Sequence, residues 1–535
     1  MPSLNFKGKT FVQNHHLAVK YHQLVPHEEF SLTDKVSLHD NLVIEGDNLK
    51  VLKALLPTYA GKIKCIYIDP PYNTGNEAWA YNDNVNSPMM QEWLGKTVDK
   101  EDLTRHDKWL CMMLPRLKLL HELLSEDGVI FISIDEIEHH YLMCLMDEVF
   151  GKDNLLGNLI WKSRQIVDSR NQNKISVDHE YIVSFGKSAT ATLRGKKSDE
   201  SKYSNPDKDP RGPWMSNTIL GLANELGRPN LHYKITDPKT GKAYDCPPDT
   251  GWRYSKETMQ SKINEGRIIF PKKDGGRPRE KKYLNELSDE FTGFSTLLNE
   301  NVGFTLNGTR DLREIFEEEL FAFPKPRTLI KVLLEQATNN NDIILDSFAG
   351  SATTAQAVFE LNKEDRGNRK FILVETESYA NTITAERMRR VIKGVPGSKN
   401  QQLKDGLGGT FSYFKLGDPI EMENLLKGEN LPSYTEFARY LFYTATGEQF
   451  TETEINRQTG FIGESSSHEV YLFYKPDLEW LKQNALTLNM VNELPAYKGK
   501  SRLIFAPVKY VDDETCSAHH IKFCQLPYEI YRMKK

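Results

Sequence analysis

The sequence predicts an α/β fold with a mixed, mostly parallel sheet, because short apolar strands alternate with helical segments in two stretches of the chain. Apolar runs at residues 64–69 and 128–135 predict buried strands before residue 190. Similar runs at residues 341–346 and 370–375 predict two more after residue 320. A polar, basic stretch separates the two sets, so we expect one sheet domain that is interrupted by an insertion.

Helical patterns lie between these predicted strands. Trp109, Met112, Met113, Leu120 and Leu124 form an apolar stripe, which predicts an amphipathic helix over residues 101–125. An apolar run at residues 42–49 turns into a helical stretch that is expected to end near Pro57. Further helices are expected from residue 136 to about 150 and at 326–338, 351–361 and 379–392, and further strands at 159–162 and 179–185. The last 135 residues mix short helices and strands, which indicates an α+β region.

These patterns divide the chain into five parts. They are an N-terminal extension (1–40), the first half of the sheet domain (41–190), the insertion (191–320), the second half of the sheet domain (321–400) and the C-terminal region (401–535). In a doubly wound sheet, ligands bind beyond the carboxyl ends of the strands. We therefore expect the functional residues in the loops that follow the predicted strands of both halves.

Composition excludes several classes of protein. The chain has 535 residues, 39% hydrophobic and 27% charged, and no apolar run approaches the ~20 residues of a membrane span. The N-terminus lacks the apolar core of a secretory signal, so we expect a cytoplasmic protein without a membrane partner. The net charge of −5 is not that of a typical nucleic-acid binder, which leaves only local basic patches for such a role.

The six cysteines indicate neither disulfides nor a metal site. None forms a C-x-x-C pair, and a chain this long buries enough apolar surface to fold without disulfides. Cys516, His519, His520 and Cys524 lie close in sequence, but their spacing matches no common zinc pattern. We therefore expect no bound metal.

The insertion carries a dense basic segment. Residues 251–283 hold ten basic and four acidic side chains, most densely at 272–282, and aromatic residues are interleaved with them. A charge run alone is often a solvated face, whereas basic and aromatic residues together suit contacts to a nucleic-acid backbone. The candidate DNA-binding residues are Arg253, Lys272, Lys273, Arg277, Arg279, Lys281 and Lys282.

The first motif with chemistry is Asp69-Pro70-Pro71-Tyr72, at the end of the strand predicted at 64–69. Two prolines fix the backbone into a rigid corner. An exocyclic amine on an aromatic base is a poor nucleophile, and hydrogen bonds from its N–H groups to Asp69 and to the Pro70 carbonyl would activate it. Tyr72 offers a stacking face for a base that has left the helix. The alternative is an ordinary strand that ends in a proline turn.

The second motif spans residues 344–354, where a strand ends at Asp346 and a small-residue turn leads into a helix. Gly350 lets a ligand approach the backbone closely. The G-x-G-x-x-G pattern of dinucleotide sites is absent. Glu375 ends the next predicted strand, which suits hydrogen bonds to ribose hydroxyls but also suits a solvated strand end.

Together these motifs resemble the DNA amino-methyltransferases, in which D-P-P-Y is the catalytic motif and D-x-F-x-G-x-G the S-adenosylmethionine motif. The order here, with the catalytic motif first and the insertion between the two, is similar to the β class, as is the F-P-K-P of residues 323–326. GDNLKVLKALLP, IYIDPPYNTGN, GVIFISIDE, DPRGPW and QLPYEIYR further resemble the modification (Mod) subunits of Type III restriction–modification systems, over about residues 40–535.

The resemblance implies a Rossmann-like methyltransferase fold and assigns roles by position. The catalytic set is Asp69, Pro70, Pro71 and Tyr72, and the cofactor set is Asp47, Lys325, Pro326, Asp346, Phe348, Ala349, Gly350, Ser351 and Glu375. Residues 41–190 become the catalytic half, 321–400 the cofactor half and 191–320 the target recognition domain. One position departs from the motif: Ala352 replaces its last glycine, which implies at most a mild loss of cofactor affinity because alanine tolerates a helix start.

The function that the resemblance implies is methyl transfer from S-adenosylmethionine to N6 of a flipped adenine in double-stranded DNA, by direct in-line attack without a metal. A cytosine-C5 enzyme needs a cysteine after a proline, and none is present. Cytosine-N4 transfer, a non-catalytic DNA-reading subunit, and RNA or protein methylation remain as alternatives. A homodimer and a restriction (Res) subunit are the expected partners, with residues 401–535 structural or partner-binding.

Overall fold

The computed structural model describes residues 4–73, 105–168, 175–273, 275–287, 291–299, 301–421, 427–428 and 430–526. The start of the helix expected at 101–125, Asn76 with its two preceding residues in the motif that begins at Ile66, and most of the C-terminal QLPYEIYR motif lie outside the described residues. Contacts within the chain define two compact units, residues 194–294 and all the rest. Residues 295–320, which the sequence placed in the insertion, therefore belong to the larger unit.

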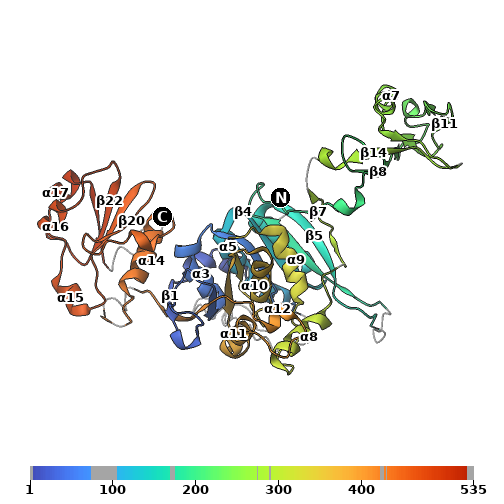
Figure 1. Ribbon diagram of the computed structural model, residues 1–535. Helices are drawn as coiled ribbons and strands as arrows, with labels where there is room; N and C mark the ends of the chain where they lie inside the picture. The colour runs from blue at the N-terminus through green and yellow to red at the C-terminus, as the bar shows by residue number, and fades with distance from the viewer. Residues whose placement is uncertain are drawn as a thin grey trace. The chain divides into compact units, whose positions relative to one another are not determined.

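The larger unit is built on one ten-stranded sheet of described residues (Figure 1). Its strands, in spatial order, are β1 (His22–Pro26), β19 (Ser412–Pro419), β2 (Leu42–Glu45), β18 (Lys370–Glu375), β17 (Ile343–Asp346), β3 (Ile63–Ile68), β4 (Leu124–Ile134), β6 (His179–Gly186), β5 (Leu155–Lys162) and β16 (Leu297–Leu298). The strands from β19 to β4 are parallel, whereas β1, β6 and β5 join antiparallel. This confirms the predicted α/β fold with a mixed, mostly parallel sheet.

Helices cover both faces of this sheet. Ile372 of β18 packs in the cluster that holds the apolar sides of α3, α5 and α6, whereas its neighbour Phe371 contacts Phe359 of α10. Because successive strand residues point to opposite faces, the two helix layers lie on opposite sides. The helices of this unit before residue 405 are α1 (Lys9–Val12), α2 (His15–Ala18), α3 (Asn48–Tyr59), α5 (Arg105–Leu123), α6 (His139–Met146), α8 (Thr305–Phe316), α9 (Arg327–Ala337), α10 (Thr353–Asp365), α11 (Glu386–Lys393) and α12 (Gln401–Lys404).

The helix expected to end near Pro57 continues to Tyr59, and Pro57 lies inside it. Proline breaks a helix mainly by removing a hydrogen bond and by clashing with the preceding turn. Here the last turn still closes, because the Ala60 N–H donates to the Leu56 carbonyl. Buried Val51, Leu52 and Leu55 anchor the same helix in the core.

The C-terminal region has its own sheet and helices. They are α14 (Tyr434–Thr446), β20 (Phe461–Glu464), β21 (His468–Leu472), α15 (Leu478–Gln483), α16 (Leu488–Asn492), β22 (Ser501–Ala506), α17 (Asp513–Ala518) and β23 (Ile521–Gln525). The sheet order is β20-β21-β22-β23, with the last three strands parallel. No helix in the described part of the chain is long and apolar enough to cross a membrane.

The unit of residues 194–294 consists of small sheets and one longer helix. Its elements are β7 (Lys196–Lys197), β8 (Trp214–Thr218), β9 (Leu220–Gly221), β10 (Ile235–Thr236), β11 (Ala243–Tyr244), β12 (Gly251–Trp252), α7 (Lys256–Asn264), β13 (Ile268–Ile269), β14 (Arg279–Tyr283) and β15 (Phe291–Thr292). A small core of Ile219, Ile235, Trp252, Met259 and Ile263 holds α7 to the strands. The largest sheet runs β13-β14-β8.

Candidate active site

The acidic residues of both sequence motifs end neighbouring strands of the central sheet. Asp69 directly follows β3, Asp346 ends β17 and Glu375 ends β18, and these three strands are adjacent and parallel. Parallel neighbours end at the same edge of a sheet. The register pairs Leu345 with Ile66, so the corner at Asp69 and the turn after Asp346 start side by side, although they are far apart in sequence.

The corner at Asp69 is held from behind by α5. The Trp109 indole donates a hydrogen bond of 2.7 Å to the Pro71 carbonyl. The next residue but one, Asn73, has a φ of 59° and donates to the fully buried carboxylate of Glu138, which also contacts His106 at 2.7 Å. Asparagine is among the few residues that adopt this left-handed conformation readily. These contacts make the corner a rigid part of the core.

Four polar side chains meet at the corner. The Lys325 ammonium donates to both carboxylate oxygens of Asp69, at 2.9 and 2.7 Å, and lies 3.4 Å from Oε2 of Glu180. The Tyr72 hydroxyl donates to the same Glu180 oxygen at 2.8 Å, and the Lys325 ammonium lies 4.8 Å from the centre of the Tyr72 ring. Asp69, Lys325 and Tyr72 were expected at the site, whereas Glu180 of β6 was not.

Burial governs the charges at this cluster. It raises the pKa of Asp69, and the Lys325 ammonium opposes that rise. Burial alone would lower the pKa of Lys325, but the carboxylates of Asp69 and Glu180 outweigh it, so the pKa of Lys325 is raised. The Asp69 side chain stays 26% exposed, against 10% for Lys325. The cluster thus combines a partly accessible acceptor with a cation that is held charged.

The second motif forms a tight turn with few free acceptors. Asp346 accepts from the Phe348 N–H at 3.0 Å and from the Thr354 hydroxyl at 2.6 Å. Glu375 accepts from the Gly350 N–H at 2.7 Å. Burial raises the pKa of Asp346 to about 7 and that of Glu375 to about 7, although these hydrogen bonds oppose the rise. Phe348, Ala349 and Ser351 are buried in the same turn, as expected for a motif that shapes a site.

The turn has a closely packed glycine and one unused hydroxyl. Gly350 has a φ of 50°, and a Cβ there would lie 3.0 Å from the Phe321 ring, so a side chain would fill the space beside this backbone. The Ser347 hydroxyl is buried and has no hydrogen-bond partner among the described residues. A close-approach glycine, a free hydroxyl and two strand-end carboxylates fit an amino-acid and ribose group such as S-adenosylmethionine carries.

Ala352 has a conformation that alanine does not adopt readily. Its φ and ψ are 63° and 36°, in the left-handed region, where an L residue costs about 1–2 kcal/mol. Alanine was expected to be tolerated here because it suits the start of a helix. That reason is wrong, because the left-handed backbone at this position favours glycine. Its methyl group is completely buried.

Residues without a recognisable motif support this turn. The buried Arg387 guanidinium of α11 donates to the Ser351 carbonyl at 2.9 Å, and burial lowers its pKa to about 10. The Thr384 hydroxyl donates to the Gly350 carbonyl at 2.6 Å. Asn48 donates to the Ser347 carbonyl at 3.1 Å. Its neighbour Asp47, which was expected in the cofactor set, instead caps α3 by accepting from the Lys50 N–H. The motif resemblance predicted Asp47, whereas the adjacent Asn48 makes the contact to the turn.

The segment before α9 is locked in place. A Cβ on Gly308 of α8 would lie 2.0 Å from the Pro324 carbonyl oxygen, so only glycine lets this backbone pass. Arg327 pairs with Glu360 at 2.7 Å and with Asp311 at 3.4 Å. Buried Pro326 immediately precedes α9. The position of Lys325 is thus fixed from both sides.

The candidate DNA-binding residues of the other unit differ in exposure. Arg253, Lys272, Lys273, Arg277, Arg279 and Lys282 are exposed. Arg253 donates to the Leu220 carbonyl. Arg279, which lies on β14 with Lys282, donates to the Ser216 hydroxyl. Lys281 departs from the expectation, because it is only 8% exposed.

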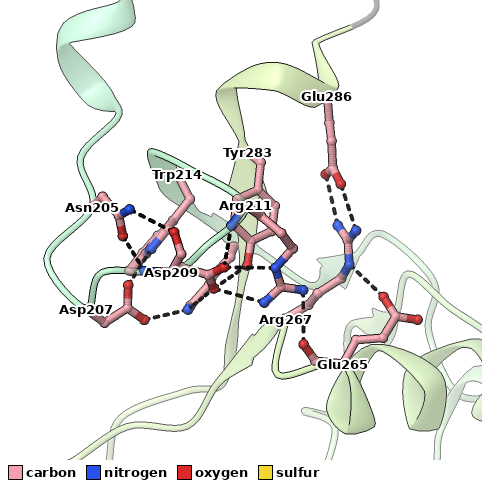
Figure 2. Close-up of polar contacts among 10 residues, drawn as sticks. Asn205, Asp207, Asp209, Arg211, Trp214, Glu265, Arg267, Tyr283 and Glu286 are labelled. Carbon is pink, nitrogen blue, oxygen red and sulfur yellow. Dashed lines mark hydrogen bonds and ion pairs between the residues drawn. The ribbon is translucent and has the colours of Figure 1, made fainter.

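Lys281 belongs to an internal ion-pair network, which Figure 2 shows around Asp209. Its ammonium contacts Asp207 and lies 2.7 Å from Oδ2 of Asp209. The Tyr283 hydroxyl and the Arg211 guanidinium also donate to Asp209, at 2.7 Å and at 2.9 Å. Several cations of the unit are therefore neutralised internally, and only the exposed ones remain available to a ligand. Within the described residues, no group of three or more His, Cys, Asp or Glu side chains is arranged to hold a metal ion.

Comparisons with known proteins agree with the motifs at this site. The profile of the DNA methylase family N6_N4_Mtase matches residues 63–386, more than half of the chain. The Type III restriction-modification enzyme StyLTI Mod subunit of Salmonella typhimurium is 28% identical over 98% of this chain and 84% of its own length. The EcoP15I Mod subunit of Escherichia coli is 31% identical over 63% of this chain and 58% of its own length.

Two further matches come from other systems. The Type II methyltransferase M.KpnI of Klebsiella pneumoniae is 33% identical over 62% of this chain and 79% of its own length. Among solved structures, the cytosine-N4-specific PvuII DNA methyltransferase has a TM-score of 0.33 and 14% identity, over 65% of this chain and 86% of its own. The profile match shows that the chain belongs to the N6 and N4 DNA methylase family, and the chain is similar to Type III Mod subunits.

Proposed function

We propose that the chain is a site-specific DNA methyltransferase that methylates N6 of adenine and acts as the modification subunit of a Type III restriction–modification system. The observation that carries this proposal is the adjacency of β3 and β17, which starts the Asp69 corner and the Asp346 turn from one sheet edge. The family membership supports methyl transfer to DNA, and the relatives named as Mod subunits support the system.

The proposed methyl donor is S-adenosylmethionine, which supplies an electrophilic methyl group when it is bound. Asp346, Gly350 and the Ser347 hydroxyl would hold its amino-acid end, and Glu375 would accept hydrogen bonds from its ribose. The unused Ser347 hydroxyl and the left-handed backbone of Gly350, where a Cβ would meet the Phe321 ring, support this assignment.

The target base is proposed to leave the helix and to stack on Tyr72. Asp69 and the Pro70 carbonyl then accept hydrogen bonds from the N6 amine, which directs the nitrogen lone pair away from the ring and towards the methyl group. Rigid placement of these groups supplies much of the rate, since near-attack geometry is worth ~7–11 kcal/mol. The support of the corner by Trp109 and Glu138 fits this need for rigidity.

The unit of residues 194–294 is proposed to recognise the DNA sequence. Its exposed Arg253, Lys272, Lys273, Arg277, Arg279 and Lys282 are the candidate phosphate contacts. A homodimer and a Res subunit are the proposed partners, with residues 401–535 available for such contacts.

The test is methyl transfer by the purified full chain. Tritiated S-adenosylmethionine is offered with unmethylated genomic DNA, with total RNA and with a glutamine peptide, and the labelled nucleosides are identified by mass spectrometry. We expect label in DNA as N6-methyladenine. N4-methylcytosine would overturn the base assignment, and label confined to RNA or peptide would overturn the substrate class. Long-read sequencing of the product then gives the recognition sequence.

A further inference from the structure

Lys325 occupies the position that the target amine would need in the proposed reaction. Its ammonium donates to both oxygens of Asp69, at 2.9 and 2.7 Å, and lies 4.8 Å from the centre of the Tyr72 ring. An exocyclic amine that is activated by Asp69 beside Tyr72 needs the same acceptor and the same space. Lysine and target amine therefore compete for one place.

The competition is built into the fold, because the backbone that carries Lys325 is fixed. Gly308 admits the Pro324 carbonyl at a distance that no side chain allows, and Arg327 is anchored by Asp311 and Glu360. Only the lysine side chain itself is left to change position. Its four-carbon stem gives it that freedom at small cost.

A second acceptor lies close enough to the Lys325 ammonium to be reached by a small change of the side-chain conformation. Oε2 of Glu180 is 3.4 Å from the Lys325 nitrogen and already accepts from the Tyr72 hydroxyl at 2.8 Å. Glu180 lies near the start of β6, which runs antiparallel beside β4, so it reaches the sheet edge where Asp69 lies. A lysine that leaves Asp69 would thus remain paired, which avoids an isolated buried charge.

We propose that Lys325 holds the place of the target amine on Asp69 while no base is bound, and moves to Glu180 when the base enters. The inference rests on the proposed function of the site. No covalent bond changes in this step: Lys325 keeps its proton, Asp69 exchanges one N–H donor for another, and Glu180 gains a donor. Lys325 and Glu180 are positioning residues in this scheme.

The exchange also keeps Asp69 ready as an ionised acceptor. The charged or titratable groups that face Asp69 are Lys325, Glu180, Tyr72, Tyr67 and Asp346. Among them, only Lys325 carries a positive charge, and it is the main group that opposes the rise in the pKa of Asp69 that burial causes, with a smaller contribution from a hydrogen bond of Tyr72. Removing this charge should raise the pKa of Asp69 further and leave more of it protonated at neutral pH.

The first test is a binding comparison that needs no catalysis. Two duplexes carry the recognition sequence read from the methylated DNA, one with adenine and one with purine, which lacks the 6-amino group, at the target position. Dissociation constants are measured by fluorescence anisotropy at pH 8.5 for the wild-type protein and for Lys325→Met. We expect the wild type to bind both duplexes within about threefold, because the amine only replaces the lysine. We expect Lys325→Met to prefer adenine by about tenfold or more, as a charge-assisted hydrogen bond implies.

The second test is the pH profile of kcat. In Lys325→Met, kcat should rise more steeply with pH than in the wild type, because Asp69 needs a higher pH to ionise. Lys325→Arg, which keeps the charge, should restore the wild-type profile, and Glu180→Gln should raise KM for DNA because Lys325 loses its second anionic partner. Lys331→Met is the matched control, since Lys331 of α9 pairs with Glu364 of α10 and not with the residues of the site.

Two outcomes would overturn the inference. An equal adenine preference in the wild type and in Lys325→Met would show that the lysine does not occupy the place of the amine. A pH profile that is unchanged in Lys325→Met would show that its charge does not act on Asp69. Both tests presuppose a wild type that methylates DNA, so the absence of any methyl transfer by the wild type counts against the proposed function instead.

Discussion

The pKa values of the carboxylates at the edge of the central sheet and of Asp209 in the unit of residues 194–294 are shifted in opposite directions. Burial with few nearby cations raises the pKa of Asp69, Asp346 and Glu375. Hydrogen bonds from Arg211 and Lys281 instead hold the pKa of Asp209 well below its usual range. Asp346 and Glu375 accept mainly from backbone N–H groups and a hydroxyl, and Asp69 accepts from a single lysine, whereas Asp209 accepts from an arginine and a lysine at once. We therefore interpret the raised pKa values as a sign of the proposed ligand site and the lowered pKa of Asp209 as a sign of a structural ion pair.

Paired substitutions of Asp69 and Asp209 give the largest contrast. Asp69→Asn removes the anionic acceptor of the target amine, and we expect a loss of about 10²–10³-fold in kcat with unchanged folding and cofactor binding. Asp209→Asn removes the centre of the ion-pair network, so the melting temperature should fall by several degrees and DNA binding should weaken with it. Methyl transfer, circular dichroism melting and limited proteolysis measure these effects.

Each half of this contrast has a result that contradicts it. An Asp69→Asn protein with near wild-type turnover would remove the carboxylate from the chemistry. An Asp209→Asn protein that melts like the wild type but fails to bind DNA would move Asp209 from a structural role to direct recognition.

The pH dependence of cofactor affinity sharpens the assignment of Glu375. Its pKa is about 7, so a change from pH 8 to pH 6 protonates most of this carboxylate. A protonated carboxyl is a poorer acceptor for ribose hydroxyls, and we expect S-adenosylmethionine to bind up to about tenfold more weakly at pH 6. Isothermal titration measures the affinity. Because the pKa of Asp346 is also about 7, Glu375→Gln should remove only the part of the pH dependence that Glu375 carries, while it weakens binding at pH 8.

The stability of the unliganded protein should change in the other direction. Because the folded-state pKa of Glu375 is raised above its ordinary value, ionisation of this group destabilises the fold, and its contribution to stability is lost as the pH rises through about 7. The melting temperature of the wild type relative to Glu375→Gln should therefore increase as the pH is lowered from 8 to 6. If affinity and relative stability fall together at pH 6, Glu375 is not the group that titrates.

The sequence predicted the site as far as local patterns reach. The strand expected at 370–375 is found at the same residues, and the two motifs start from adjacent strands because each follows a buried parallel strand. Glu180, Gly308 and Arg387 were not predicted, because their contacts to the site span at least fifteen intervening residues and they lie in segments of ordinary pattern. Only the three-dimensional path of the chain assigns them a role.

The basic segment of the recognition unit shows the same limit. Alternation along β14 predicts that Lys281 and Lys282 point to opposite faces. It does not predict that Asp207 and Asp209 cover the face of Lys281, since those residues come from a loop more than seventy positions earlier. Charge density alone therefore named six exposed cations and one buried one.

These neighbouring lysines provide a matched pair of smaller effect. Lys282→Ala should reduce the slope of log Kd against log salt by about 0.9 if Lys282 contacts one phosphate, with an unchanged melting temperature. Lys281→Ala should lower the melting temperature and leave the salt slope as it is, because its charge is already neutralised. Anisotropy titrations over a range of salt concentrations and thermal melts separate the two. A salt slope that responds only to Lys281 would reverse the assignment of the two residues.

The smallest effect is expected at Ala352, which lies at the end of the turn that holds the proposed cofactor residues. Its left-handed backbone costs an alanine about 1–2 kcal/mol, and glycine removes that cost but has more conformational freedom in the unfolded chain, by roughly 0.5–1 kcal/mol. Ala352→Gly should therefore stabilise the protein by about 1 kcal/mol or less, measured by denaturant unfolding. Because the alanine methyl group is completely buried, cofactor affinity should stay within about twofold of the wild type. A gain in affinity of tenfold would mean that the methyl group limits the space for the cofactor, and the position would then belong to the binding surface rather than to the support behind it.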